Sequence, residues 1–256
     1  YDVRLTLPAN YTVGATGDLV PGSEDNEAER VRLDSLVTAS VKWVASEGWL
    51  EDNNDFPDSE EQFKTLHYRQ SRVHDFAWFA DKRYKVLRGE VELPGQGTKV
   101  TTWSMFTPEE GVLWQKAPEY LHDATFYYSL WNGDYPYNQV TAVDGTISAG
   151  GGMEYPNVTV IGASGSDSGL ETVIVHEVGH NWFYGILGSN ERENAWMDEG
   201  INSFNETRYM VTKYGDDNSI SFLLGNGNNL ARRLELEDFK YRWIDELSYL
   251  FPARFG

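Results

Sequence analysis

The length, composition and charge of the chain restrict its class before any motif is considered. It has 256 residues, of which 40% are hydrophobic and 24% charged, so it can fold as one large globular domain or two small ones. The net charge of −19 argues against nucleic acid and anionic membrane surfaces as partners. No stretch is apolar enough for membrane insertion. The absence of cysteine excludes disulfides and thiolate chemistry.

The first part of the chain predicts β-structure. Residues 1–20 alternate apolar and polar side chains around a Pro-Ala-Asn turn, and residues 83–106 do the same around a Pro-Gly-Gln-Gly turn. Two acid-rich runs, 22–30 and 51–61, lie between these segments and are predicted to be solvated loops. We therefore expect a β-rich part over residues 1–103.

The second part predicts helices and strands in mixed order. A threonine followed by proline and two glutamates starts a helix over about 107–131, and strands follow near 139–143 and 158–161. A capping box then starts a helix over about 168–187, and another helix is expected over about 194–214. With the β-rich first part, this pattern predicts the α+β class.

The helix expected after residue 168 contains the sequence His176-Glu177-Val178-Gly179-His180. On a helix, the two histidines lie one turn apart and about 40° apart around the axis, so both imidazoles can bind one tetrahedral metal ion. Glu177 is rotated by about 100° from His176 and can reach a water in an open metal position, where a general base is needed. The alternative is a chance pattern with two hydrogen-bonded core histidines.

A candidate third ligand, Glu199, follows His180 after an interval of eighteen residues. Two histidines and one glutamate leave the fourth position to water, which is typical of a catalytic zinc site rather than of a closed structural one. Ligands without sulfur also suit zinc better than copper or iron–sulfur chemistry. The pattern predicts one Zn²⁺ ion, while another divalent metal stays open.

These motifs resemble those of the gluzincin zinc metallopeptidases, and in particular the aminopeptidase N and leukotriene hydrolase family. The resemblance rests on the histidine motif, the spacing to Glu199 within Trp-x-x-Glu-Gly, and a segment upstream that is similar to the family's Gly-x-Met-Glu-Asn motif. That segment is Gly151-Gly152-Met153-Glu154-Tyr155-Pro156. The resemblance implies that Glu154 binds the free α-amino group of the substrate and that Gly151, Gly152 and Met153 also line the substrate site.

The resemblance further implies that Glu206, seven residues after Glu199, orients a ligating histidine, as partners of metal ligands regularly do. A solvated helix position is the alternative for Glu206. Two departures from the family pattern, Tyr155 and Asp198 where the family has asparagine, bear on substrate preference more than on metal binding. The other histidines, His67, His74 and His122, lack ligand spacing, and we expect them at the surface or in hydrogen bonds.

The resemblance also implies a domain arrangement. Residues 1–103 would be the C-terminal part of a β-rich N-terminal domain, and residues 104–256 the N-terminal part of an incomplete thermolysin-like catalytic domain. The family has a catalytic tyrosine beyond the third ligand; Tyr241 and Tyr249 lack its expected context. We therefore expect a chain truncated at both ends, with weak or no activity of its own.

The function that follows is a zinc-dependent aminopeptidase. Its substrates would be peptide or protein N-termini, and a metal-activated water would hydrolyse the first peptide bond with Glu177 as general base. The alternatives are a zinc endopeptidase, an epoxide hydrolase of the same family, or a non-catalytic metal-binding fragment. The acidic, cysteine-free composition suits an extracytoplasmic enzyme, secreted or periplasmic. The preferred N-terminal side chain of the substrate and the oligomeric state stay open.

Overall fold

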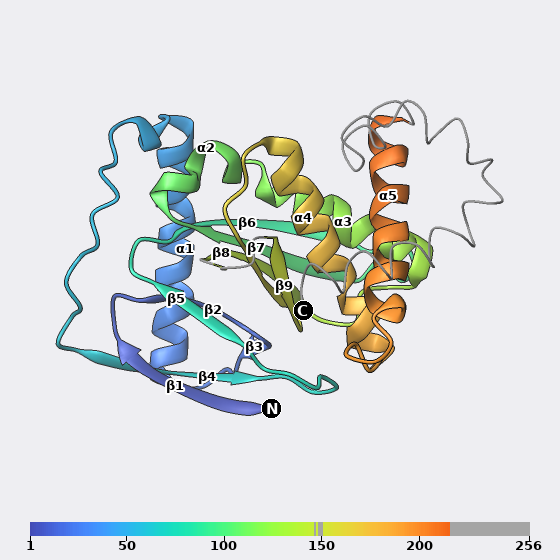
Figure 1. The fold of residues 1–256 in the computed structure, drawn as a ribbon. Helices are drawn as coiled ribbons and strands as arrows, with labels where there is room; N and C mark the ends of the chain where they lie inside the picture. Colours follow the sequence, from blue (N-terminus) through green and yellow to red (C-terminus); the bar gives the residue numbers. More distant parts are fainter. Residues whose placement is uncertain (146, 148–150, 216–256) are drawn as a thin grey trace. The chain divides into compact units, whose positions relative to one another are not determined.

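The computed structural model describes residues 1–145, 147 and 151–215 (Figure 1). These residues fall into two compact units, of which the first covers Tyr1–Val178 and the second begins at Gly179. Tyr241 and Tyr249 lie outside the described residues. No helix within the described ranges combines the length and the apolar character that crossing a bilayer would need.

The first unit contains three β-sheets. Their strand orders are β1-β4-β3, β2-β5 and β6-β7-β8-β10-β9. The strands are β1 (Asp2–Pro8), β2 (Thr12–Ala15), β3 (Asp18–Leu19), β4 (Phe63–Arg69), β5 (Trp78–Asp81), β6 (Lys85–Glu92), β7 (Lys99–Phe106), β8 (Gln139–Asp144), β9 (Gly152–Tyr155) and β10 (Val158–Ile161). In the five-stranded sheet, β7, β8 and β10 are parallel, and the two edge strands β6 and β9 run antiparallel to their neighbours. The Gly-Met-Glu segment thus forms an edge strand, β9.

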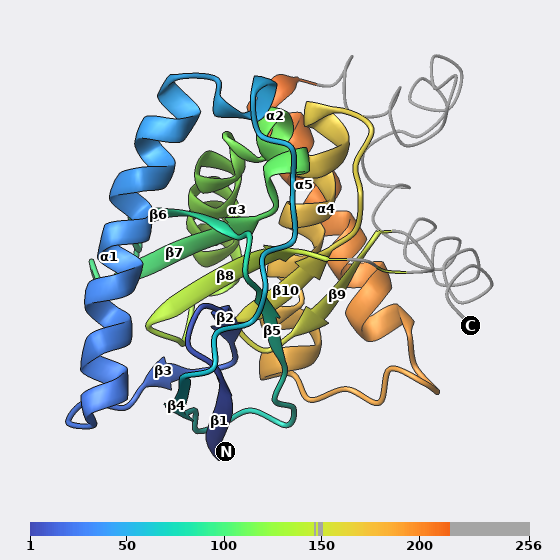
Figure 2. The same ribbon diagram turned by 90° about the vertical axis from the view of Figure 1, so that its left-hand side faces the viewer.

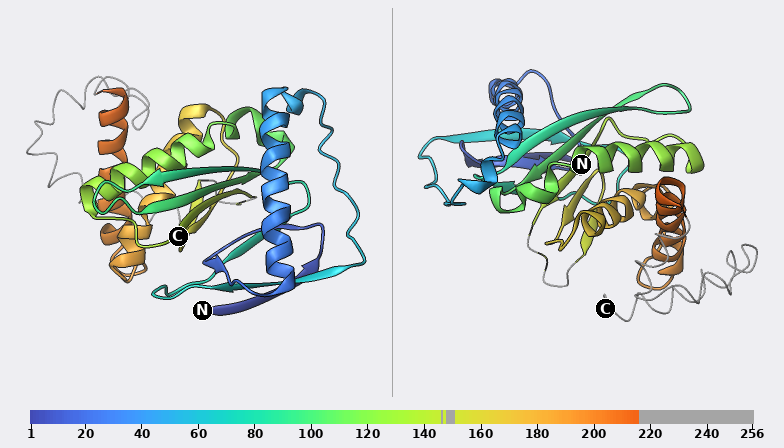
Figure 3. Two further views of the ribbon diagram at one scale, coloured as in Figure 1. Left: turned by 180° about the vertical axis from the view of Figure 1, so that it is seen from behind. Right: turned by 90° about the horizontal axis from the view of Figure 1, so that it is seen from above.

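The first unit also contains helices. They are α1 (Glu24–Ala45), η1 (Gly48–Leu50), η2 (Pro108–Glu110), α2 (Gly111–Trp114), α3 (Ala117–Asn132) and α4 (Asp167–Gly179), whose last residue already belongs to the second unit. Of these, α1, α2 and α3 pack against the sheets of the first unit. Helix α1 lies against β6 and β4 (Figure 2), and α3 lies along β6, β7 and β8 (Figure 3). Leu33 of α1 joins a buried cluster with Val86, Met105, Val143 and Val160 of the five-stranded sheet.

Helix α1 corrects one expectation. The acid-rich run 22–30 was predicted to be a solvated loop, but it forms the first turns of a 22-residue helix. The Ser23 hydroxyl caps this helix by accepting a hydrogen bond from the Asn26 amide at 3.2 Å, and three acids occupy the first turn. Acidic side chains at this position are stabilised by the helix dipole. The second acidic run, 51–61, forms neither helix nor strand, as expected.

A buried ion pair connects α1 to β4. Lys64 Nζ lies 2.6 Å from Glu29 Oε2, and the two side chains are 8% and 2% exposed. Lys64 also donates to the Tyr11 carbonyl oxygen at 2.6 Å, while Arg32 lies 3.0 Å from the other Glu29 oxygen. Burial lowers the pKa of Lys64. Every charge in this group therefore has a close partner, as buried ions require.

The helix predicted over 107–131 is divided into η2, α2 and α3. Pro118 lies near the start of α3, where its missing amide hydrogen costs nothing, and Gly133 follows the last helical residue. The strands predicted near 139–143 and 158–161 are confirmed as β8 and β10. The second unit contains η3 (Asn181–Ile186), η4 (Trp196–Gly200) and α5 (Ile201–Tyr214), with η4 packed against both others.

Candidate metal centre

The histidine motif lies on helical backbone from end to end. Helix α4 carries His176 and Glu177, and His180 directly after it keeps helical torsion angles of φ −63° and ψ −14°. The two histidines are therefore one helical turn apart along the chain, as the spacing predicts. The boundary between the units falls between Val178 and Gly179, so His176 and Glu177 belong to the first unit, and His180 and Glu199 to the second.

In the second unit, one ring nitrogen of His180 is held by a backbone carbonyl. Its side chain is 1% exposed, and its Nδ1 lies 3.0 Å from the carbonyl oxygen of Phe183. A carbonyl oxygen can only accept, so Nδ1 carries the hydrogen, and in a neutral ring Nε2 is then the nitrogen with the lone pair. This is the hydrogen bond that metal-binding histidines regularly make through the nitrogen that does not bind the metal.

The carbonyl oxygen that bonds to His180 belongs to Phe183, at a break in the predicted helix. We expected helix to about Leu187, but Phe183 (φ −96°, ψ 97°) and Tyr184 (φ 109°, ψ −58°) leave helical geometry. This break interrupts the helix where the Phe183 carbonyl meets the His180 ring. No signal in the sequence marks Phe183 for this role, because any residue supplies the same carbonyl.

Glu199 lies beside the other ring nitrogen of His180, Nε2, within the same unit. Its Oε2 is 3.7 Å from His180 Nε2. Two ligands of one tetrahedral zinc ion, each about 2.0–2.2 Å from the metal, would be roughly 3.3–3.6 Å apart. The two side chains thus fit a shared zinc ion in donor type and, closely, in spacing.

Two further carboxylates of the second unit, those of Asp198 and Glu206, lie on either side of Glu199 along the chain. Asp198 is 1% exposed and accepts a hydrogen bond from the Glu199 amide at 2.9 Å. Burial raises the pKa of Asp198. Glu206, on α5, is only 5% exposed, so the alternative of a solvated helix position for Glu206 is wrong.

In the first unit, the structure brings Glu154 and Glu177 together. Each offers a carboxylate oxygen within 4.8 Å of the other's. Glu177 is 6% exposed and lies directly against β9: a Cβ built on Gly152 would come within 2.5 Å of Glu177 Cγ and 2.6 Å of its Oε1. Alternation along β9 places Glu154 on the same face as Gly152. A glycine at position 152 therefore leaves the space that the Glu177 carboxylate occupies.

The other two residues of the segment that were expected to line the substrate site are Gly151 and Met153. Met153 lies on the opposite face of β9 from Glu154 and is 42% exposed. Gly151 has φ 75°, a value that favours glycine, and its carbonyl oxygen accepts from the Gly162 amide at 2.7 Å. A role of either residue in substrate binding stays a prediction.

The histidines without ligand spacing lie where expected. His67 Nε2 is 2.7 Å from Asp2 Oδ1, and His122 Nδ1 is 2.9 Å from Asp123 Oδ1. His74 is exposed. None of the three belongs to a potential metal-ligating group within the part of the chain that the structure describes.

Comparison with known proteins identifies the fold. Neither a family model nor a curated protein matches the chain. Among solved structures, an M1 zinc metallopeptidase from Deinococcus radiodurans matches with a TM-score of 0.55 and 18% identity, over 84% of this chain and 41% of its own. A mutant M1 zinc metallopeptidase from that organism, bound to a Tyr-Ser-Ala substrate, matches with a TM-score of 0.53 and 17% identity, over the same shares.

The chain spans about two fifths of the length of these structural relatives. At such identities the likeness concerns the fold. It agrees with the mixed α and β architecture and several sheets described above. The chain therefore shares the fold of part of the M1 zinc metallopeptidases.

Proposed function

We propose that this chain is the metal-binding part of a zinc peptidase, with the ion held by His176, His180 and Glu199. The observation that carries the proposal is the second-unit pair, in which a buried His180 with its Nδ1 already bonded lies 3.7 Å from Glu199. His176 adds a second imidazole one helical turn before His180. Bound zinc would lower the pKa of a coordinated water and polarise the scissile carbonyl.

Glu177 is proposed as the general base. It follows a ligand directly in the sequence, and its carboxylate is buried beside the edge strand β9. In this role it takes a proton from the attacking water and later gives it to the leaving amine. Its burial keeps bulk water from competing for that proton.

Glu154 is proposed as the anchor of the substrate's free α-amino group. In a peptide, the α-amino nitrogen is two bonds, or roughly 2.5 Å, from the first carbonyl carbon. A carboxylate that binds this amine must therefore lie close to the general base that serves the same carbonyl. The proximity of the Glu154 and Glu177 carboxylates meets this requirement, which supports an aminopeptidase.

A comparison of two substrates tests this function. The full-length protein is given an aminoacyl chromogenic amide with a free amine, and the same compound with an acetylated amine. We expect hydrolysis of the free-amine substrate alone, lost on chelation and restored by zinc. Glu154→Gln should raise KM for it about tenfold or more, because the charged amine would lose its negatively charged partner.

The control is Glu92→Gln, which removes one negative charge from an exposed position at the end of β6. It should leave KM unchanged. Equal hydrolysis of both substrates would contradict the anchor role of Glu154 and would indicate an endopeptidase instead.

A further inference from the structure

The turn between β9 and β10 has an unusual buried residue. The turn is Tyr155-Pro156-Asn157-Val158, and Asn157 has φ 50° and no exposed surface. Proline favours the second position of a tight turn, and asparagine tolerates the left-handed conformation of the third. This turn connects the strand that carries Glu154 to β10, where Thr159 pairs with Glu154.

The side chain of Asn157 bonds to three other segments of the first unit. Its Oδ1 accepts from the Gly17 amide at 2.8 Å and from Gln139 Nε2 at 2.7 Å. Its Nδ2 donates to Gln70 Oε1 at 3.0 Å. The turn is thereby linked to the loop before β3, to the first residue of β8 and to the residue after β4.

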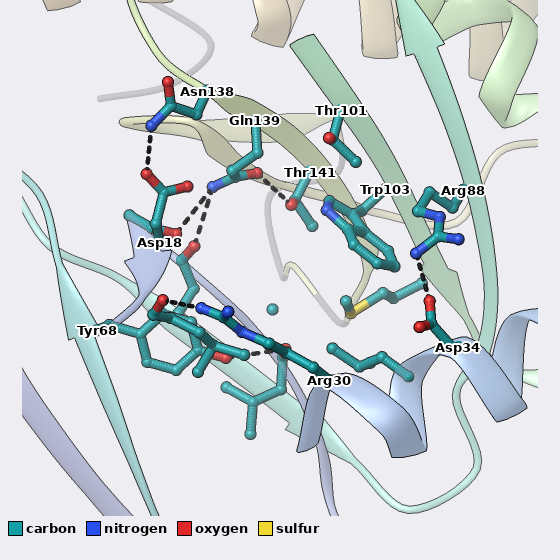
Figure 4. Close-up of a pocket in the computed structure, with 17 residues that line it drawn as sticks. Asp18, Arg30, Asp34, Tyr68, Arg88, Thr101, Trp103, Asn138, Gln139 and Thr141 are labelled. Atoms are coloured by element: carbon teal, nitrogen blue, oxygen red, sulfur yellow. Dashed lines mark hydrogen bonds and ion pairs between the residues drawn. The ribbon is translucent and has the colours of Figure 1, made fainter. Parts of the chain in front are cut away.

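Gln139 is itself fixed in the orientation that this network needs. Its Oε1 accepts from the Thr141 hydroxyl at 2.6 Å, so its amide nitrogen faces Asn157. That nitrogen also lies 3.3 Å from the Gly17 carbonyl oxygen. Figure 4 shows Gln139 bonded to Thr141 on the wall of a cavity of about 470 Å³. Gly17 and Gln139 line this cavity, so the hydrogen bonds of the buried Asn157 connect the turn to its wall.

A second contact holds the same hairpin from another strand. The Tyr155 ring lies 6.0 Å from the Phe79 ring of β5, centroid to centroid, at an interplanar angle of 48°. Tyr155 directly follows Glu154, and alternation along β9 places the two side chains on opposite faces. Glu154 therefore lies on a strand that is held in two ways. Asn157 fixes its turn, and Tyr155, on the opposite face from Glu154, packs on Phe79 of β5.

We propose that Asn157 is a positioning residue for substrate binding: its buried amide network fixes the β9–β10 turn and so holds Glu154 beside Glu177. The proposal rests on the proposed function, in which Glu154 anchors the substrate amine. Loss of the network would let β9 shift relative to the general base. Such a shift affects amine binding first, because Glu154 lies on β9 whereas Glu177 is carried by α4.

Asn157→Gly in the full-length protein tests this role, since glycine keeps the left-handed turn and removes only the amide. We expect KM for the free-amine substrate to rise about three- to tenfold, because the three hydrogen bonds of the amide are lost and their loss reaches the substrate only through Glu154, with kcat nearly unchanged. Asn157→Asp keeps both acceptor bonds and loses the donation to Gln70, so its KM should be intermediate. Lower protein stability alone would reduce kcat with the amount of folded enzyme and leave KM unchanged.

Asn54→Gly is the matched control, because Asn54 also has a left-handed φ of 53° but lies outside the network. It should leave KM at the wild-type value. A double variant, Asn157→Gly with Glu154→Gln, should show no further rise in KM beyond Glu154→Gln alone, since Asn157 acts through Glu154.

Unchanged KM in Asn157→Gly, or an equal rise in Asn54→Gly, would overturn the role of Asn157. If Glu154→Gln raises KM and Asn157→Gly does not, only the positioning role fails. If Glu154→Gln leaves KM unchanged, the amine anchor fails as well, and both proposals are overturned.

Discussion

At the scale of single residues, the motif His176-Glu177-Val178-Gly179-His180 and the spacing to Glu199 predicted the candidate ligands from the sequence alone. This was possible because metal ligation demands particular side chains at a helical interval. The carbonyl of Phe183, which fixes the ring of His180, was not predictable. A backbone group leaves no trace in the sequence, and only the break at Phe183 and Tyr184 shows it.

A packing contact of Gly152 was not predictable for a related reason. The resemblance predicted that the glycines of this segment line the substrate site, and the structure shows that Gly152 also leaves room for the Glu177 carboxylate. The contact joins residues that are 25 positions apart in the chain. It depends on how β9 packs beside α4, which local sequence does not determine.

The general base can be tested at this scale with Glu177→Gln. Glutamine keeps the size of the side chain but cannot take a proton from water at neutral pH, so we expect kcat to fall by about 10²-fold or more. Zinc content should stay at the wild-type level, because Glu177 is not a proposed ligand. The measurement is kcat for the free-amine substrate alongside elemental analysis; a variant that kept most of its activity would contradict the role.

At the scale of elements, strands were predicted better than helix boundaries. The alternating pattern predicted β1, β2, β6 and β7; burial alternates along β1, whereas all four residues of β2 are buried. Helix α1 was missed because its buried positions are Asn26, Glu29, Leu33 and Ser40, which form no apolar stripe. Besides the packing of Leu33, hydrogen bonds and ion pairs to other segments hold this helix, and these cannot be seen in a local window.

The buried ion pair of α1 gives a stability prediction. Lys64→Met should lower the free energy of unfolding by about 3 kcal/mol, because Glu29 would stay buried with one partner fewer. Chemical denaturation followed by tryptophan fluorescence measures the change. The matched control is Lys99→Met, since Lys99 also lies 2.6 Å from a glutamate, Glu90, but in an exposed pair.

We expect little change in the control, because water already screens an exposed pair. Equal stability of Lys64→Met and the wild type would show that the pair contributes nothing. Replacing both members, with Glu29→Gln added to Lys64→Met, should recover part of the loss because no buried charge is left with a missing partner.

At the scale of the whole molecule, the mixed α and β fold was predictable and agrees with the structural likeness to M1 zinc metallopeptidases. The strand order was not. Placing β9 at the edge of a sheet beside β10, rather than next to β8, requires long-range pairing that periodicity cannot supply. The domain boundary expected at residue 103 stays a prediction.

The most direct test of the central claim is the zinc stoichiometry of the protein, because metal binding requires only the three proposed ligands and no turnover. The protein is stripped with a chelator, reloaded with zinc, passed over a desalting column and analysed for metal, beside His180→Ala treated in the same way. We expect one zinc ion per chain in the wild type and far less in the variant, which loses a buried ligand. A wild type that retains no zinc, or a variant that retains as much as the wild type, would contradict the proposed metal centre.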